Sequence, residues 1–393
     1  MTGLVAECLG LRRWALPLLA RSVSPEDSAK TIPTVSPRAW ALFLAAETVS
    51  RPLAARLGQF SALLPTSSQH ALRHSAREEA QRVMAARAQL ANIDQIAEWC
   101  ALEPVVLKGG VHAADGGEGF DLGDLDLLLD SGDVVRFRQA LVEQGGYRFH
   151  PRLDQLKLDG AITVELHDHL EVGYGIELAG GTANQHLAGF QRLGRLAPAA
   201  HVAYCIQHTT TKHPLRRGHL RDVLLIADAL DDCSAEELVQ LETALRASRS
   251  RDVYLQTLTL ARSLQPCATT TSPVLDPFTR FAAGKYATSV WFPSGSAAAF
   301  PLLLDHIPHF VAPPADAWRL IVGYLGTDVQ ALSRWNSPLL SRVAPRLAIA
   351  LGTIVRTPYR IVALAYALIV GVAIRILYAL VWRSLASPNS KNS

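Results

Sequence analysis

Residues 105–129 read VVLKGGVHAADGGEGFDLGDLDLLL. Apolar strands are predicted at 105–107 and 124–129, and the second strand carries Asp124 and Asp126. Side chains two residues apart in a strand project to the same face, so the two carboxylates are expected side by side. Two like charges this close repel each other, and a divalent cation such as Mg²⁺ or Mn²⁺ removes the repulsion by binding their oxygens. The spacing therefore predicts a divalent-cation site on this strand.

A Lys-Gly-Gly turn, residues 108–110, joins the first strand to the segment that follows. Gly109 and Gly110 lack side chains, so their backbone N–H groups can approach a triphosphate closely, and Lys108 offers a point charge to it. The simpler interpretation is a turn with no ligand. The sequence thus nominates Lys108, Gly109 and Gly110 as nucleotide-binding residues.

A third carboxylate, Glu165, lies in the predicted strand of ITVELHDHL, residues 162–170. If this strand pairs beside 124–129, Glu165 comes within reach of Asp124 and Asp126, while Val164 and Leu166 face the core. Two metal ions that clamp the attacking and leaving oxygens of a phosphoryl or nucleotidyl transfer need such a third ligand. Asp124, Asp126 and Glu165 are therefore the predicted metal ligands and catalytic carboxylates.

The rest of the chain is predicted to be mostly helical. Ser36 followed by Pro37 marks a helix start, and apolar residues at three- and four-residue spacing predict a long amphipathic helix over 68–100. Asp159-Gly160 between two apolar runs predicts a hairpin. Helices are predicted again at 199–211, 221–231, 234–248 and 254–263. The predicted fold class is α+β, with a small mixed sheet that carries helices on one side.

Five segments follow from this pattern. They are an N-terminal amphipathic segment with a linker (1–35), N-terminal helices (36–100), an α/β core (101–196), a helical domain on the acceptor side (197–345) and a hydrophobic, basic tail (346–393).

The ordered motifs LKGG, GDLDLLLD and VELHDHL, followed by a helix with His and Lys and then by LRD, resemble an uncharacterised nucleotidyltransferase family of the DNA polymerase β-like superfamily. The resemblance covers roughly residues 69–290. It implies a mixed-sheet nucleotidyltransferase core flanked by N-terminal helices and a C-terminal helical region. It places Gly109 and Gly110 in the nucleotide turn, makes Asp124 and Asp126 metal ligands, and supports Glu165 as the third carboxylate with His167 beside it.

In the helical half, His208, Lys212 and His213 are similar to a His-containing helix of that family, and Leu220-Arg221-Asp222 to its LRD element. His208 and Lys212, four residues apart, share one helix face. The resemblance implies that His167, His208, Lys212, His213 and Arg221 contact the acceptor or a phosphate. Structural or surface histidines, and an internal Arg221–Asp222 salt bridge that fixes the helix to the sheet, are the alternatives.

One departure concerns the approach to the aspartates. Family members commonly carry an Arg a few residues before the two aspartates, whereas this chain has Glu118, Phe120 and Asp121 there. Acidic groups in this place repel a triphosphate unless cations compensate for them.

Charge and cysteine content bear on partners and location. The net charge is only +3, and no basic stripe with interleaved aromatic residues lies near the aspartates, which argues against a nucleic-acid partner. Five scattered cysteines without a CxxC pair favour the reducing cytoplasm. Residues 361–382 are apolar except for Arg375 and are as long as a membrane-spanning helix, about 20 residues. They predict attachment of the 346–385 region to the inner face of a membrane. A packing or dimer-forming helix is the alternative.

These observations predict a Mg²⁺- or Mn²⁺-dependent enzyme that transfers a nucleotidyl group from an NTP to a small-molecule, peptide or protein acceptor. The alternative is a membrane-tethered protein of the same fold that binds or scaffolds in a biosynthetic pathway without turnover. A polymerase or tRNA-modifying enzyme is less favoured, because the basic groove that would follow a nucleic-acid backbone is missing from the pattern.

Overall fold

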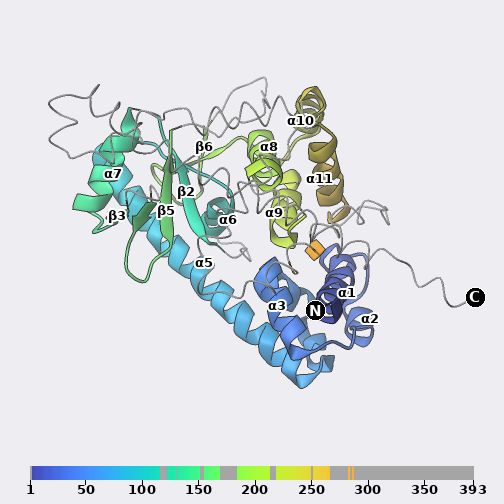
Figure 1. Ribbon diagram of the computed structural model, residues 1–393. Helices are drawn as coiled ribbons and strands as arrows, with labels where there is room; N and C mark the ends of the chain where they lie inside the picture. Colours follow the sequence, from blue (N-terminus) through green and yellow to red (C-terminus); the bar gives the residue numbers. More distant parts are fainter. Residues whose placement is uncertain are drawn as a thin grey trace, which may run out of the picture. The chain divides into compact units, whose positions relative to one another are not determined.

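The computed structural model describes residues 2–115, 122–130, 132–150, 155–168, 184–212, 218–248 and 251–265, together with 282–283 and 286 (Figure 1). The chain divides into two compact units, residues 3–290 and 291–393. The described residues from Gly3 onward all belong to the first unit. The predicted 361–382 helix and the acidic approach at 118–121 lie outside the described residues.

The N-terminal part is helical. It consists of α1 (Thr2–Leu19), α2 (Pro25–Lys30), α3 (Pro37–Glu47), α4 (Ser50–Leu57) and a 3₁₀ helix, η1 (Gly58–Leu63). The predicted helix start at Ser36 is confirmed, because the Ser36 side chain accepts a hydrogen bond from Ala39 N and Pro37 is the first helical residue. Trp14 of α1 packs edge-on against Trp40 of α3, whose ring in turn meets Phe43. Helices α1 and α3 are thereby joined through a buried aromatic cluster.

The long helix α5 (Thr66–Cys100) confirms the amphipathic helix predicted over 68–100. Its first turns pack against α3 and α4, and its last turns pack against α6 (Gly109–Asp115) and α7 (Asp133–Glu143). Figure 1 shows it running from the N-terminal helices to the sheet. Leu90, Ile93 and Ala97 are buried there, so α5 packs its apolar side chains into the core beneath the sheet.

The sheet contains seven strands in the order β3-β4-β5-β2-β1-β7-β6. Their bounds are β1 Val105–Val106, β2 Asp124–Leu128, β3 Arg148–His150, β4 Gln155–Lys157, β5 Thr163–His167, β6 Asn184–His186 and β7 Gly194–Leu196. β2 runs parallel to β5 and antiparallel to β1, and β4 and β5 form the antiparallel hairpin predicted at Asp159-Gly160. Gly160 has φ +75°, the left-handed conformation that favours glycine in such a turn.

Helices cover both faces of the sheet, so the prediction of helices on one side is wrong. Helices α5 and α7 pack against one face, whose core includes Val106, Leu125, Leu127, Val164 and Leu166. On the other face, Val105 and Leu107 pack against Ala200 and Tyr204 of α8 (Pro198–Gln207). The alternation of Val105, Val106 and Leu107 between the two cores is the two-residue period of a strand that is buried on both sides.

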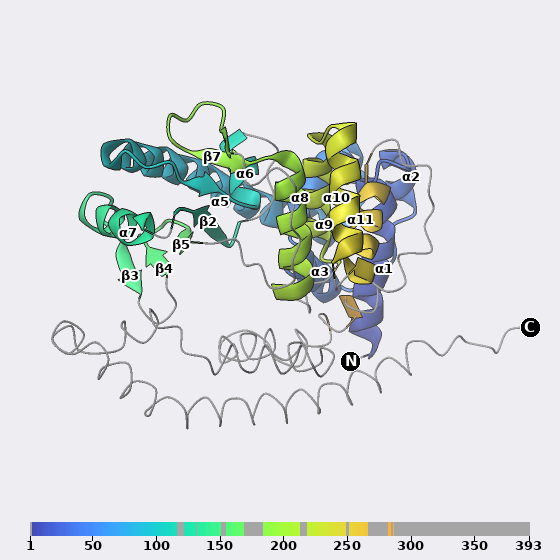
Figure 2. The ribbon, with the colours of Figure 1, turned by 90° about the horizontal axis from the view of Figure 1, so that it is seen from above.

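The remaining helices are η2 (His208–Lys212), a π-helix, α9 (Leu220–Asp231), α10 (Ala235–Ala247) and α11 (Arg251–Ser263). Helices α8 to α11 pack against one another (Figure 2). The four helices predicted between 199 and 263 are present, with the difference that residues 208–212 widen into a π-turn. Helix content and mixed sheet together confirm the α+β class. Among the described helices, none is both long and apolar enough to cross a bilayer.

Asp94 of α5 holds the chain that leads into β7. Its carboxylate accepts hydrogen bonds from the backbone N–H groups of Gln191 (2.9 Å), Arg192 (2.8 Å) and Leu193 (2.9 Å). Asp94→Ala removes all three acceptors, and we expect the free energy of unfolding to fall by roughly 3 kcal/mol in a urea titration. Glu98→Ala, at an exposed position of the same helix, is the control. A loss for Asp94→Ala no larger than that for Glu98→Ala would contradict this role.

Candidate metal and nucleotide site

The predicted pairing of the two carboxylate strands is confirmed. β2 and β5 pair in parallel with Asp126 opposite Glu165 and Leu128 opposite His167. Ligand atoms of Asp126, Glu165 and His167 all lie within 4.8 Å of one another. Leu125, Leu127, Val164 and Leu166 point into the core on the opposite face, so the polar residues gather on the face that α8 also covers.

Asp126 is the centre of this group, with only 1% of its side chain exposed. Lys108 Nζ lies 2.7 Å from Oδ2, and His167 Nε2 lies 2.8 Å from Oδ1. Burial alone would raise the pKa of Asp126. The Lys108 cation, the hydrogen bond from His167 and the charges of His167 and His208 outweigh burial and hold that pKa well below its usual range. Asp126 is therefore an ionised carboxylate with both oxygens in polar contacts.

Lys108 reaches Asp126 because of its backbone conformation. Leu107 N donates to the Asp126 carbonyl (3.0 Å), which extends the β1–β2 pairing by one residue. Lys108 then adopts φ +50°, a left-handed conformation that is uncommon for a residue with a side chain. Burial lowers the pKa of Lys108, but the carboxylates of Asp126, Asp124 and Glu165 raise it by more. The pKa of Lys108 is therefore above its usual value. The ammonium group is thus held charged at the site.

Gly109 and Gly110 each lie close to a neighbouring side chain. A Cβ atom on Gly109 would lie 2.6 Å from Leu122 Cδ2, and one on Gly110 would lie 2.6 Å from Val106 Cγ1. Gly110 N donates to the Leu107 carbonyl (3.2 Å), so this N–H is already used inside the turn. Close approach of side chains accounts for the two glycines, and their contact with a nucleotide stays a prediction.

The carboxylates predicted to flank Asp126 differ in their surroundings. Glu165 is half-buried, and its Oε1 accepts a hydrogen bond from Gln155 Nε2 of the neighbouring strand β4 (2.6 Å). Asp124, also half-buried, is not part of the group within 4.8 Å, although its charge raises the pKa of Lys108. The structure therefore brings His167, and not Asp124, into the closest group around Asp126 and Glu165.

In the helical half, the residues predicted to contact the acceptor lie in different elements. His208 begins η2, with its ring 6.0 Å from that of Tyr204, and its charge lowers the pKa of Asp126. Lys212 ends η2, and His213 lies outside the described residues. Arg221 donates to Asp222 Oδ1 through Nε (3.0 Å) and Nη2 (2.8 Å). The internal Arg221–Asp222 salt bridge is confirmed, but it lies within α9 and does not join that helix to the sheet.

Two buried side chains of α8 were missed by sequence reasoning. His201 is buried, makes a hydrogen bond to the Lys108 backbone and has a pKa lowered to about 3 by burial and by the nearby charges of His112 and Arg195. Burial raises the pKa of the Cys205 thiol to about 12, so this thiol is protonated at neutral pH. The sequence did contain a pattern that could have indicated these two residues. His201, Cys205 and His208 recur at the four- and three-residue spacing of one helix face.

The donor set fits a divalent cation. Asp126 and Glu165 offer the hard carboxylate oxygens that Mg²⁺ and Mn²⁺ prefer, and His167 either donates to Asp126 or adds an imidazole ligand that suits Mn²⁺ better than Mg²⁺. The Lys108 ammonium group contacts Asp126 Oδ2, so a cation that binds this oxygen must displace the ammonium group.

Fold and site together define an α+β protein with a group of Asp126, Glu165 and His167 whose ligand atoms are arranged closely enough to hold one metal ion. The model of an uncharacterised nucleotidyltransferase family matches residues 34–266, more than half of the chain, which therefore belongs to this family. Membership supports nucleotidyl transfer as the general activity and an NTP as the substrate. A search of curated proteins and a search of solved structures each found no match.

Replacing Lys108 by Met removes the charge and keeps most of the side-chain length. Asp126 would lose one of its two compensating partners, and we expect the free energy of unfolding without divalent cations to fall by about 3 kcal/mol. Because the lysine no longer competes for Asp126 Oδ2, Mn²⁺ should raise the melting temperature of Lys108→Met more than that of the wild type.

Thermal denaturation with and without Mn²⁺ measures both effects. Lys30→Met is the matched control, since Lys30 forms an exposed ion pair with Glu26, 2.5 Å away. A Mn²⁺-induced shift in Lys108→Met that is no larger than the wild-type shift would contradict competition between Lys108 and the cation.

Proposed function

We propose that this protein is a Mg²⁺- or Mn²⁺-dependent nucleotidyltransferase that transfers a nucleotidyl group from an NTP to an acceptor hydroxyl or phosphate. The observation that carries the proposal is the buried group of Asp126, Glu165 and His167 with Lys108 beside it, in a chain of a nucleotidyltransferase family. Buried, charge-compensated carboxylates of this kind are costly to maintain, which favours a functional site.

Asp126 and Glu165 hold the cation in this proposal, and Asp124 on the same strand face supplies a further carboxylate. A cation held by these residues would supply positive charge that offsets the negative charge of the triphosphate during transfer. His167 orients Asp126 through the 2.8 Å contact with Oδ1. Lys108, displaced from Asp126 Oδ2, contacts the triphosphate as a fixed positive charge.

The reaction then needs a proton acceptor. The acceptor oxygen attacks the α-phosphorus, the bond between the α-phosphorus and its bridging oxygen to the β-phosphate breaks, and pyrophosphate leaves. Glu165, half-buried and held by Gln155, takes the proton of an acceptor hydroxyl.

The acceptor is proposed to bind on the side of α8, η2 and α9. His208 is the residue with the best support, because its ring lies 6.0 Å from that of Tyr204, which packs against Val105 and Leu107 on the face of the sheet that carries Asp126. Lys212 and His213 follow it in sequence and are proposed to contact the acceptor or a phosphate. Arg221 is engaged with Asp222, so we assign it to the helix and not to the acceptor.

A second function is favoured by one observation. Lys108 forms an ion pair with Asp126 (2.7 Å), and the acidic residues Glu118 and Asp121 precede the aspartate strand, a combination that suits a binding or scaffold protein without turnover. Thermal shift with Mg²⁺ or Mn²⁺ and each NTP separates the two functions: stabilisation by one of these pairs supports the transferase, and no stabilisation by any supports the scaffold.

Asp126→Asn removes the buried charge and keeps the side-chain shape. We expect it to abolish Mg²⁺-dependent pyrophosphate release from the NTP that the wild type uses, because the cation loses its central ligand. Asp130→Asn, on an exposed residue just beyond the same strand, should retain activity.

Mass spectrometry of cells that carry the wild type, Asp126→Asn or Asp130→Asn should find a nucleotidylated product with the first and third only. Full turnover by Asp126→Asn would sink the assignment.

Residues 346–385 are proposed to attach the protein to the cytoplasmic face of a membrane. Membrane fractionation of the full chain and of a chain ending before Pro358 tests this: the full chain should sediment with membranes and the shortened chain should not. Equal distribution of the two forms would rule out attachment through this segment.

A further inference from the structure

The π-helix η2 (His208–Lys212) continues directly from α8, and the His208 ring lies 6.0 Å from that of Tyr204, which packs against Val105 and Leu107 on the face of the sheet that carries Asp126. π-turns are rare and occur frequently at functional sites, because the wider turn redirects the side chains that follow. The hydroxyl of Thr210 donates to the Ile206 carbonyl of the preceding turn (2.6 Å). This hydrogen bond is local to the helix.

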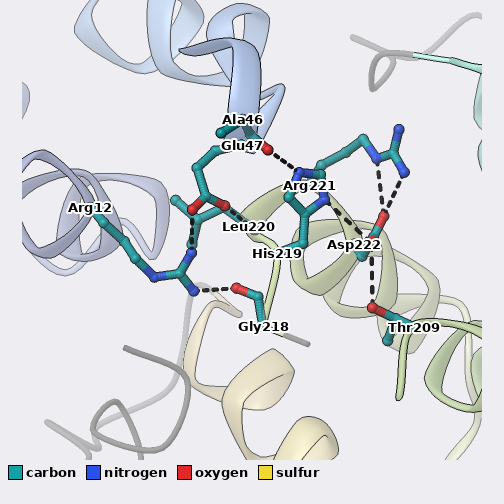
Figure 3. A network of polar contacts seen from close by, with 9 residues as sticks. All are labelled: Arg12, Ala46, Glu47, Thr209, Gly218, His219, Leu220, Arg221 and Asp222. Atoms are coloured by element: carbon teal, nitrogen blue, oxygen red, sulfur yellow. Dashed lines mark hydrogen bonds and ion pairs between the residues drawn. The ribbon is translucent and has the colours of Figure 1, made fainter. Parts of the chain in front are cut away.

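Thr209, the neighbouring residue, bonds in a different direction. Its hydroxyl donates to Asp222 Oδ2 on α9 (3.3 Å), although its side chain is as deeply buried as that of Thr210. The other Asp222 oxygen accepts from Arg221. Thr209 therefore fixes the second residue of η2, next to His208, to a charged group on another helix (Figure 3).

Asp222 is itself held by the N-terminal helices. His219 Nδ1 lies 3.3 Å from Asp222 Oδ2, and His219 Nε2 donates to the Ala46 carbonyl of α3 (2.6 Å), since a carbonyl can only accept. Figure 3 shows the ring of His219 between these two partners. The buried ring of His219 thus lies between α3 and the start of α9.

A second contact reinforces the same junction. Glu47, the residue after Ala46, is fully buried and accepts hydrogen bonds from Arg12 Nη1 (2.7 Å), Leu220 N (2.8 Å) and the Tyr286 hydroxyl (2.5 Å). Arg12 of α1 also donates to the Gly218 carbonyl. Residues 218–220 are thus fixed by α1 and α3 in a dry environment, where such charge pairs tolerate little displacement.

We propose that Thr209 and Asp222 are positioning residues for the transferase site. They hold η2 so that His208 stays beside Tyr204, on the face of the sheet that carries Asp126, and His219 links α3 to Asp222. The role of His208 toward an NTP rests on the proposed function, whereas its placement by Thr209 does not. Helix α8, from which η2 continues, packs through Ala200 and Tyr204 against Val105 and Leu107, next to the strand β2 that carries Asp126, which places the chain of contacts on the same face as the carboxylate centre.

Thr209→Val tests the proposal, because valine has nearly the shape of threonine and no hydroxyl. Thr209→Ser restores the hydroxyl, and Thr210→Val is the matched control in the same π-helix. The first measurement is calorimetric binding of ATP, GTP, CTP and UTP, each with Mg²⁺. For the NTP that binds the wild type, we expect about tenfold weaker binding to Thr209→Val, and near wild-type binding to Thr209→Ser and Thr210→Val. Equal affinities of Thr209→Val and Thr210→Val would overturn the proposal.

The second measurement needs no nucleotide. The ¹H–¹⁵N side-chain signals of the ¹⁵N-histidine-labelled full chain report on His208, whose signal is assigned as the one missing from His208→Gln. Thr209→Val should shift this signal, Thr209→Ser should restore it, and Thr210→Val should leave it near the wild-type position. An unshifted His208 signal in Thr209→Val, or equal shifts in the two valine variants, would overturn the positioning role. If no NTP binds the wild type, the proposed function fails, and this comparison still decides the placement of His208.

Discussion

A buried carboxylate with two cationic or hydrogen-bonding partners is the constraint on which the site depends. Asp126 is 1% exposed, and an ionised group in such a place is stable only when its charge is compensated. Lys108 comes from the turn after β1 and His167 from the end of β5, so both strands must pair with β2 for the compensation to exist. Folding of the sheet core and assembly of the charged centre are therefore one event.

Sequence reasoning reached the parts of this arrangement that depend on local periodicity. Two-residue alternation in strands placed Asp126 and Glu165 on one face, and their parallel pairing brought them together. The two-residue alternation of a strand gives no information about backbone conformation in a turn. It therefore did not predict the left-handed backbone of Lys108, whose side chain contacts Asp126. The two glycines were predicted to form a nucleotide-binding turn, which stays a prediction, and the pattern did not show that a Cβ atom at either position would crowd Leu122 or Val106.

The N-terminal helices were harder to interpret because their partners are distant in sequence. The segment 1–35 was predicted to be amphipathic, but Arg12 within it is buried against Glu47, thirty-five residues later, and against Gly218. The family match begins at residue 34, after α1, and yet α1 supplies Arg12 to the junction that holds α9. The helices before the matched region are thus structurally tied to the helical half of the site, which local patterns could not indicate.

The central claim is that Asp126 and Glu165 bind a divalent cation while Lys108 contacts an NTP. The most direct test is a crystal structure of the full chain with Mn²⁺ and a non-hydrolysable NTP analogue. The account predicts an anomalous manganese peak at the Asp126 and Glu165 oxygens, with Lys108 Nζ moved from Asp126 Oδ2 to the triphosphate. A nucleotide bound elsewhere, with the Lys108–Asp126 contact intact, would contradict it.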